Sequence, residues 1–191
     1  METYKTEEYK TYKIAIVQDD DVFDPRKWDN FGKMACFHKR YSLGDKHNFT
    51  DPADLISFLK KEKAIYLPLY LYDHSGITIA TTPFSCQWDS GQIGYIYVTR
   101  QDILKEFTCK KITKDIKQKV INLLESEVET YDKYLTGEVF GFTITDKSGD
   151  IIDSCYGYYD TPDNILKEVK KNIDKYYDYQ LDLNLTEEAT K

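Results

Sequence analysis

The sequence predicts an α+β fold in which an antiparallel sheet built from hairpins is backed by helices. Two pairs of β-rich runs each enclose a short turn that contains glycine, which is typical of hairpins. Apolar residues also recur at helical spacing over 114–135 and 162–176. The predicted hairpin strands are 66–72 with 77–82, and 139–145 with 151–156. The sequence contains no repeat, no glycine-rich nucleotide loop and no regular alternation of strand and helix.

Two further strands are predicted outside these hairpins. Residues 13–18 have a β-rich composition, and they are followed by three aspartates, a residue type that is depleted in strands. Residues 93–98 form the other run. Between them, residues 22–50 show no clear period. A connection of that length within a compact domain either has a function or contains short strands.

Capping residues mark the ends of the predicted helices. A side chain that accepts an amide proton, or a proline at the first helical position, stabilises a helix start. The predicted starts are Asp51 with Pro52, Thr99 with Asp102, Thr113, and Thr161 with Pro162. Gly137 follows the longest helical pattern and is expected to end it with a left-handed conformation.

The length and composition favour one globular domain. At roughly 150 residues per domain, a chain of 191 residues predicts a single domain, over residues 12–178, with polar tails at 1–11 and 181–191. The 17 tyrosines and 9 phenylalanines exclude a disordered chain. No run approaches the roughly 18 apolar residues that a membrane span needs, and the first residues do not resemble a secretion signal. We therefore expect a cytoplasmic protein that does not bind membranes.

Cysteine and charge patterns restrict the function classes. The four cysteines are scattered without the short spacings of zinc or redox motifs, so we expect no metal and no cofactor. The net charge is −7, and residues 137–191 contribute −6 of it with 6 Lys or Arg against 12 Asp or Glu. This acidic third argues against direct binding of nucleic acid. Residues 64–98 contain no Lys or Arg, which is typical of a buried centre.

Two loops, 24–45 and 73–91, have the composition of a functional site. Each contains a Trp-Asp pair together with His, Cys and Gly, at Trp28-Asp29 and Trp88-Asp89. One interpretation is structural, because each aspartate can close its own turn while the tryptophan packs beneath it. One helix and one strand separate the loops, so we expect the two loops to converge on one face.

A cysteine nucleophile is the main chemical hypothesis for these loops. Cys86 is the candidate nucleophile and His74 the candidate base, and Asp73, Asp89 or Asp29 can supply the orienting group. Among these Asp89 is the main candidate, and His38 is a further candidate catalytic residue. A thiol between Phe84 and Trp88 can equally be packed and inert. A metal bound by two of the three histidines with Cys36, Cys86 or a loop aspartate is disfavoured because no standard zinc spacing is present.

The candidate binding residues fall into a loop set and an acidic set. The loop set is Trp28, Asp29, Arg40, Tyr41, Asp73 and Trp88. The acidic set is Asp150, Asp153, Asp160 and Asp163. The acidic set suits contact with a basic surface, including the nucleic-acid groove of a nuclease.

Three long segments of the chain carry a resemblance to a known family. They include WDN…FHKRYSLGD in 24–48, YDHSG and PFSCQWDSGQ in 66–99, and ETYDKYLTGEVFGF in 127–142. These strings resemble a family of proteins encoded by phages, plasmids and other mobile elements of Gram-positive and gut bacteria. The resemblance implies an accessory protein but no particular reaction, so no catalytic residue is carried over.

A small acidic accessory protein of a mobile element most often acts by binding a host protein. We expect a cytoplasmic protein of the bacterial host that binds and inhibits a host defence protein, of the anti-CRISPR or anti-restriction type, with a nuclease effector as one such partner. The alternative is a small hydrolase or a ligand-sequestering protein that uses the Cys, His and Asp loops on a nucleotide signal.

Overall fold

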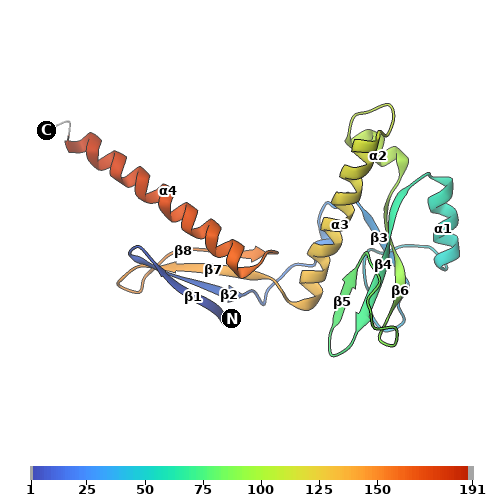
Figure 1. Ribbon diagram of the computed structural model, residues 1–191, viewed down its shortest axis with the longest axis horizontal. Coiled ribbons are helices and arrows are strands. Elements are labelled where there is room, and N and C mark those ends of the chain that lie inside the picture. The colour runs from blue at the N-terminus through green and yellow to red at the C-terminus, as the bar shows by residue number, and fades with distance from the viewer. Residues whose placement is uncertain (1, 189–191) are drawn as a thin grey trace. The chain divides into compact units, whose positions relative to one another are not determined.

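The computed structural model describes residues 2–188, with residues 177–188 described by their backbone alone, and confirms the predicted α+β class with antiparallel sheets (Figure 1). The chain forms two compact units: unit 1 comprises Met1–Val22 and Gly137–Lys191, and unit 2 comprises Phe23–Thr136. Unit 2 is therefore inserted between the two halves of unit 1. Each unit has its own sheet and its own core, which differs from the single domain expected over residues 12–178.

The sheet of unit 1 has four strands. In spatial order they are β1 (Thr3–Tyr9), β2 (Tyr12–Gln18), β7 (Phe140–Thr145) and β8 (Ile151–Tyr158), and all neighbours are antiparallel. The expectation of a polar tail over residues 1–11 is wrong, because β1 pairs with β2 along its length. The β1 sequence TYKTEEY is polar because an edge strand of this kind has much of its surface in solvent.

One face of this sheet is covered by α4 (Pro162–Glu188). The contact is apolar, with helical residues at spacings of three and four packed on alternate residues of the central strands. Its buried members are Ile14, Ile16, Phe140, Phe142 and Ile144 from the sheet and Ile165, Leu166, Val169 and Ile173 from the helix. The backbone of α4 continues into the segment 181–191 that is expected to be a tail, and residues 189–191 lie outside the described residues.

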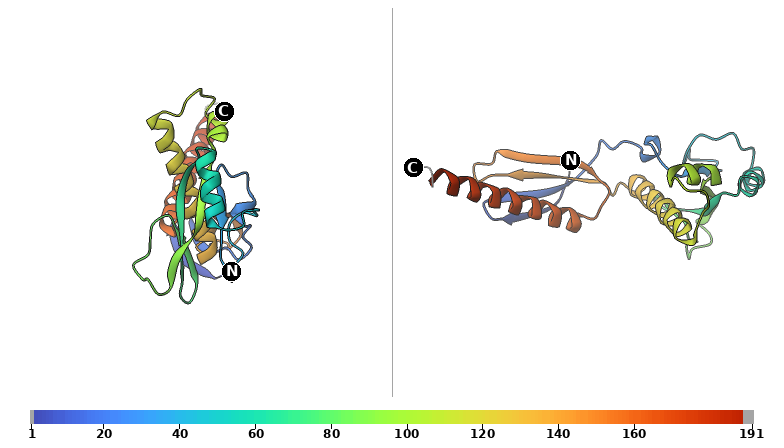
Figure 2. Two further views of the ribbon diagram at one scale, coloured as in Figure 1. Left: turned by 90° about the vertical axis from the view of Figure 1, so that its right-hand side faces the viewer. Right: turned by 90° about the horizontal axis from the view of Figure 1, so that it is seen from above.

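Polar contacts hold α4 toward the β1 side of the sheet. Lys5 pairs with Asp163 at 2.6 Å, Glu7 pairs with Lys170, and the Tyr9 hydroxyl donates to Asp174 at 3.0 Å. The right-hand view of Figure 2 shows the helix along β1 and β2, with β8 at the opposite edge. β8 is consequently exposed over nearly its whole length.

Unit 2 contains a second four-stranded antiparallel sheet. Its spatial order is β3 (Lys33–Cys36), β6 (Ser90–Val98), β4 (Ile65–Asp73) and β5 (Ile77–Ala80). The prediction of one sheet containing both hairpins is therefore wrong: the first hairpin lies here and the second lies in unit 1. Local patterns locate the strands, but pairing between distant strands is decided by tertiary packing. β3 is a short strand within the irregular stretch 22–50.

Helices pack on both faces of this second sheet. On one face α3 (Lys114–Thr136) buries Val120, Leu124, Val128 and Tyr131. On the other face α1 (Pro52–Lys61) buries Leu55 and Leu59 against Ala35 and Tyr97. Two shorter helices, η1 (Pro25–Lys27) and α2 (Arg100–Glu106), complete the unit.

The predicted helix caps are confirmed. The Asp51 carboxylate accepts from the Asp54 amide at 2.9 Å, and the Thr99 hydroxyl accepts from the Asp102 amide at 3.2 Å. Gly137, after α3, has a φ of 74°, in the left-handed region that glycine adopts without strain. Within the described residues, no helix combines the length and apolar composition needed to cross a bilayer.

Candidate functional site

The two polar loops of unit 2 meet at Asp73, as the sequence predicts. The Tyr41 hydroxyl donates to Asp73 Oδ1 at 3.1 Å, and Arg40 Nη1 lies 3.2 Å from Asp73 Oδ2. Asp73 ends β4, so its position is set by the sheet, whereas Arg40 and Tyr41 belong to the loop after β3. Both charges of this contact are satisfied within the protein.

His38 supports the same contact rather than offering an unused base. Its ring stacks on Tyr41 with centroids 5.1 Å apart and planes 8° apart. The Tyr41 amide donates to His38 Nδ1 at 3.2 Å, so this nitrogen is the acceptor. The Arg40 guanidinium lies 5.1 Å from the same tyrosine ring. Tyr41 therefore has a cation, an imidazole and a carboxylate as neighbours.

The Cys86, Asp89 and His74 side chains come together, but not in the order of a catalytic triad. Cys86 Sγ lies 3.8 Å from Asp89 Oδ2, and His74 Nδ1 lies 3.2 Å from the same oxygen. An activated nucleophile needs the imidazole next to the thiol and the carboxylate behind the imidazole. Here the carboxylate stands between them, which favours a loop contact over a nucleophile.

The two Trp-Asp pairs are more exposed than the structural interpretation expects. The Trp88 side chain is 96% exposed and Trp28 is 49% exposed, so Trp88 does not pack beneath its turn. The turn after Trp28 is closed by the Asn30 side chain, which donates to the carbonyl of Pro25 at 2.8 Å, rather than by the exposed Asp29.

An open polar cavity of about 440 Å³ lies beside these contacts. Its wall includes His38, Arg40, Asp73, Trp88 and Asp89, together with residues 90–92. The arginine of this wall, Arg40, is the partner of Asp73, and Asp89 adds a second carboxylate, so the cavity presents an excess of negative charge rather than an anion site. Such a cavity suits a small polar ligand better than a phosphate group.

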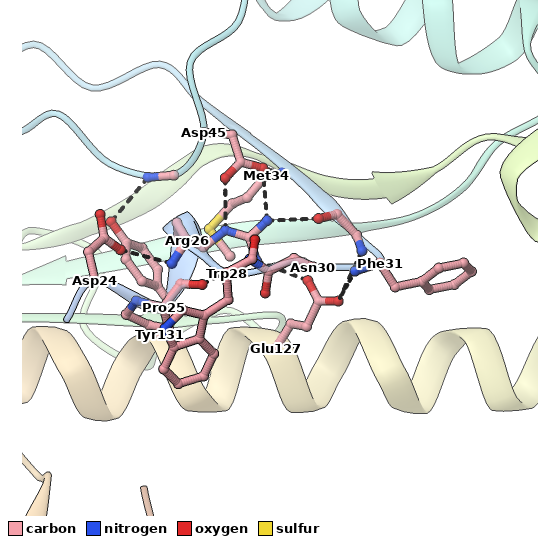
Figure 3. Close-up of polar contacts among 12 residues, drawn as sticks. Asp24, Pro25, Arg26, Trp28, Asn30, Phe31, Met34, Asp45, Glu127 and Tyr131 are labelled. Atoms are coloured by element: carbon pink, nitrogen blue, oxygen red, sulfur yellow. Dashed lines mark hydrogen bonds and ion pairs between the residues drawn. The ribbon is translucent and has the colours of Figure 1, made fainter. Parts of the chain in front are cut away.

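A buried arginine that sequence reasoning missed holds the first loop in place (Figure 3). The Arg26 side chain is 3% exposed. It makes two bonds to Asp45, at 2.8 and 2.9 Å, one to Glu127 at 2.9 Å and one to the Gly32 carbonyl at 2.7 Å. Burial acts to lower the pKa of Arg26, but hydrogen bonds and charges from Asp45 and Glu127 outweigh it and raise the pKa.

The acceptors of Arg26 also bind backbone amides. Asp45 Oδ2 accepts from the Met34 amide at 2.7 Å, and Glu127 Oε1 accepts from the amides of Phe31 and Gly32, each at 2.9 Å. The network therefore ties the loop to β3 and to α3. The sequence gives little indication of this network, because Asp45 and Glu127 lie 19 and 101 residues from Arg26. The Asp-Pro-Arg start of the loop is the one local signal.

The four acidic candidates of unit 1 surround one strand. Asp153 lies within β8, Asp150 immediately precedes it, and Asp160 and Asp163 follow it. β8 spans eight residues, and a strand rises about 3.3 Å per residue. Asp150 and Asp160 are therefore separated by the length of β8, about 26 Å. They do not form one compact acidic patch.

β8 itself is the most exposed strand of the described chain and contains large apolar side chains. Ile151 is 68% exposed, Ile152 51% and Tyr156 40%. β8 is an edge strand, so its outer backbone groups face no other strand of residues 2–188. Exposed apolar edges of this kind are normally blunted by lysine or proline, because they pair with other chains.

Beside β8 an apolar cavity of about 260 Å³ opens between the sheet and α4. Its lining consists of Tyr12, Ile144, Ile152, Asp153, Asn172, Ile173 and Tyr176. At the end of β8, Tyr158 packs against Phe142. Burial first, and then Cys155, Glu168 and Asp153, raise the pKa of Tyr158 to about 12.

The comparisons with known proteins add no identification. No protein family, no curated protein and no solved structure matches the chain. Among the described residues, no group of three or more His, Cys, Asp or Glu side chains is placed to hold a metal ion.

Proposed function

We propose that this protein acts by binding another protein through the β8 edge of unit 1, and not through a catalytic centre. The observation that carries this proposal is the exposure of β8: it is an edge strand with two isoleucines more than half exposed, and none of the described residues covers them. Large apolar side chains at an exposed edge favour pairing with a partner chain. The order of Cys86, Asp89 and His74 gives less support to an enzyme.

The class of partner follows from the resemblance to proteins of mobile elements. We propose that the chain binds and inhibits a host defence protein, of the anti-CRISPR or anti-restriction type, in the bacterial cytoplasm. The acidic residues around β8 support a partner with a basic surface, such as a nuclease effector.

The test is capture of the partner by tagged full-length protein from a bacterial host lysate, followed by an inhibition assay with the purified partner. Ile151→Lys places a charge on the β8 edge, and Thr6→Lys is the matched variant on β1. Capture and inhibition by the wild type and by Thr6→Lys, but not by Ile151→Lys, support the proposal. Equal capture by both variants contradicts it.

A second candidate function is the sequestration or hydrolysis of a small nucleotide signal in unit 2. The exposed Trp88 in the wall of the polar cavity favours it, because an exposed indole can stack on a base. The carboxylates of the same wall do not favour the phosphate group of such a ligand. Trp88→Ala, His74→Ala and Cys86→Ala distinguish the two functions. If these variants lose activity while Ile151→Lys retains it, the cavity is the functional site.

A further inference from the structure

Four segments of unit 2 that are far apart in the sequence meet at one end of its sheet. β6 ends at Val98, which pairs with Ile65 at the start of β4, and β3 begins at Lys33, opposite Tyr97 in β6. α1 ends just before β4, and α2 begins just after β6. A short loop then leads from α2 to the first turns of α3, so all of these segments lie at the end of unit 2 marked by α2 in Figure 1.

This end of unit 2, called the basic end below, consists of Lys33, residues 60–63 and residues 99–119. It has eleven cationic side chains, all exposed: Lys33, Lys60, Lys61, Lys63, Arg100, Lys105, Lys110, Lys111, Lys114, Lys117 and Lys119. The carboxylates of the same segments are Glu62, Asp102, Glu106 and Asp115. A fifth, Asp29, lies in the loop whose Phe31 packs on Phe107 with ring centroids 6.1 Å apart. Eleven cations against five carboxylates give the basic end a net charge of +6.

The cations of the basic end are available to a ligand. No ion pair joins any of the eleven side chains to another residue of the described chain. The loop between α2 and α3 is held in place, because Phe107 and Ile112 pack on the core and the Cys109 amide donates to the Leu104 carbonyl at 3.1 Å. Lys110 and Lys111 therefore extend from a loop whose position is fixed by folding.

The acidic net charge of the chain belongs to the other unit. Unit 1 contains 9 Lys or Arg against 18 Asp or Glu, whereas unit 2 contains 17 against 15. The sequence-based argument against nucleic acid concerns residues 137–191, which all lie in unit 1. Salt screens exposed charges beyond about 10 Å at 0.1 M ionic strength. The residues near a bound ligand, rather than the net charge of −7, therefore decide which sign of charge it needs.

The composition of the basic end favours a nucleic acid over the other polyanions. Residues 60–63 and 99–119 expose no large apolar side chain. A membrane-binding surface inserts apolar side chains among its lysines, and a protein interface buries an apolar centre. A phosphate backbone needs neither, since the release of its counterions by lysine supplies the binding free energy. The start of α3, a helix of 23 residues, adds a positive partial charge at the same end.

We propose that the basic end of unit 2 binds the phosphate backbone of a nucleic acid without reading its sequence. The lysines act as separate point charges along the backbone, and no group at this end is required to contact a base. The inference goes beyond the proposed function and does not depend on the β8 edge.

The experiment measures fluorescence anisotropy of labelled nucleic acids titrated with the full-length protein. The probes are a DNA duplex of about 20 base pairs and single strands of DNA and RNA of the same sequence. We expect saturable binding of at least one probe at 50 mM salt. For a duplex, neutralising about four phosphates should weaken binding roughly a hundredfold between 50 and 200 mM salt. A second probe of unrelated sequence should bind with an affinity within about twofold of the first.

A triple charge reversal tests the basic end directly. Lys110→Glu with Lys111→Glu and Lys114→Glu should weaken the binding of every sequence about tenfold or more, and should reduce the dependence on salt. Glutamate near the start of a helix is favourable, so this variant is expected to fold, and circular dichroism verifies it.

The matched control changes the charge of the chain equally in unit 1. Lys147→Glu with Lys171→Glu and Lys175→Glu replaces three exposed lysines of that unit. This variant should bind within about threefold of the wild type at 0.1 M salt, because screening limits the reach of the new charges. Equal weakening by the two triple variants would mean that net charge alone sets the affinity, and would overturn the inference.

Three further outcomes overturn it. The inference fails if none of the three probes binds at 50 mM salt, or if vesicles containing phosphatidylserine bind as tightly as DNA. It also fails if the protein alone forms a salt-sensitive dimer that the basic-end variant abolishes, because the acidic unit 1 of a second copy is then the ligand. Ile151→Lys should bind nucleic acid like the wild type, so failure at β8 and failure at the basic end are distinguishable.

Discussion

The two polar loops of unit 2, 24–45 and 73–91, differ from the β8 edge of unit 1 in which side chains find partners within the protein. In the loops, Arg26, Arg40 and Asp73 all bind partners within the protein, and Arg26 is almost completely buried. In β8, the isoleucines are exposed, and no strand within the described part of the chain pairs with the outer edge. The unusual sequence of the loops thus stabilises unit 2, whereas the plainer strand leaves apolar side chains exposed, and this exposure is the basis of the proposed function.

This difference shows why residue type alone is a weak guide to a site. Histidine, cysteine and tryptophan draw attention to the loops, but a polar side chain whose partners lie in its own chain has little left for a ligand. A site is better indicated by groups that folding leaves uncovered. β8 meets that condition. The four aspartates around it meet it only in part, since Asp163 is paired with Lys5 and Asp160 accepts from the Thr161 amide and the Asn164 side chain.

The largest effect should come from removing the buried arginine. Arg26→Ala leaves the Asp45 and Glu127 carboxylates without their cation, and breaking a buried pair costs about 3–5 kcal/mol. Urea unfolding followed by tryptophan fluorescence measures this change in unit 2, which contains both tryptophans. Lys27→Ala, at the adjacent exposed position, is the control and should change stability by less than about 0.5 kcal/mol. Equal stability of the two variants would contradict a structural role for the loop network.

Thiol reactivity should separate the two regions next. Burial first, and then Asp45, raise the pKa of Cys36 to about 12, so about one thiol in ten thousand is ionised at pH 8. Cys155 in β8 is exposed. Alkylation at pH 8, mapped by mass spectrometry, should label Cys155 at least about a hundredfold faster than Cys36. Comparable rates would mean that the loop region opens readily.

Alkaline pH should weaken the loop region specifically. The pKa of Cys36 rises from 9.0 to about 12 on folding, and that of Tyr131 from 10.0 to about 12, in both cases chiefly through burial. Below pH 9 both groups are protonated in both states and stability is unaffected. Above pH 9 the unfolded thiol releases a proton that the folded state retains, so stability falls by up to about 1.4 kcal/mol per pH unit. Cys36→Ala should reduce the fall in the free energy of unfolding between pH 9 and 10, measured by urea unfolding at each pH. If the variant shows the same dependence of this free energy on pH as the wild type, Cys36 is not its source.

Much of the local structure could be predicted from the sequence. The Asp51, Thr99 and Gly137 caps and the two hairpins depend on neighbouring residues, and the structure confirms them. The convergence of the two loops at Asp73 could also be predicted, because one helix and one strand return the chain to the same edge.

Long-range arrangements could not be predicted in this way. The division of the hairpins between two sheets depends on which strands meet after a separation of more than one hundred residues. The Arg26 network joins residues 26, 45 and 127, which no local pattern relates. The exposure of β8 follows from the position of α4, which is set by the contacts of α4 with β1. The polar sequence of β1 does not indicate a strand, so these contacts could not be predicted. The apolar content of β8 alone would predict burial.

The smallest effect should come from the exposed ion pair between the two loops. Arg40 is 70% exposed and Asp73 23%, and such pairs contribute about 0–1 kcal/mol. A double-mutant cycle with Arg40→Ala and Asp73→Asn, measured by urea unfolding, should give a coupling within that range that decreases in 0.5 M salt, because screening weakens exposed pairs. Tyr41→Phe keeps the ring and removes the hydroxyl bond to Asp73, and it serves as the matched variant. A coupling free energy above about 2 kcal/mol, well beyond the range for exposed pairs, would mean that the Arg40–Asp73 pair is shielded from water. The contact between the two loops would then resemble the buried Arg26 network.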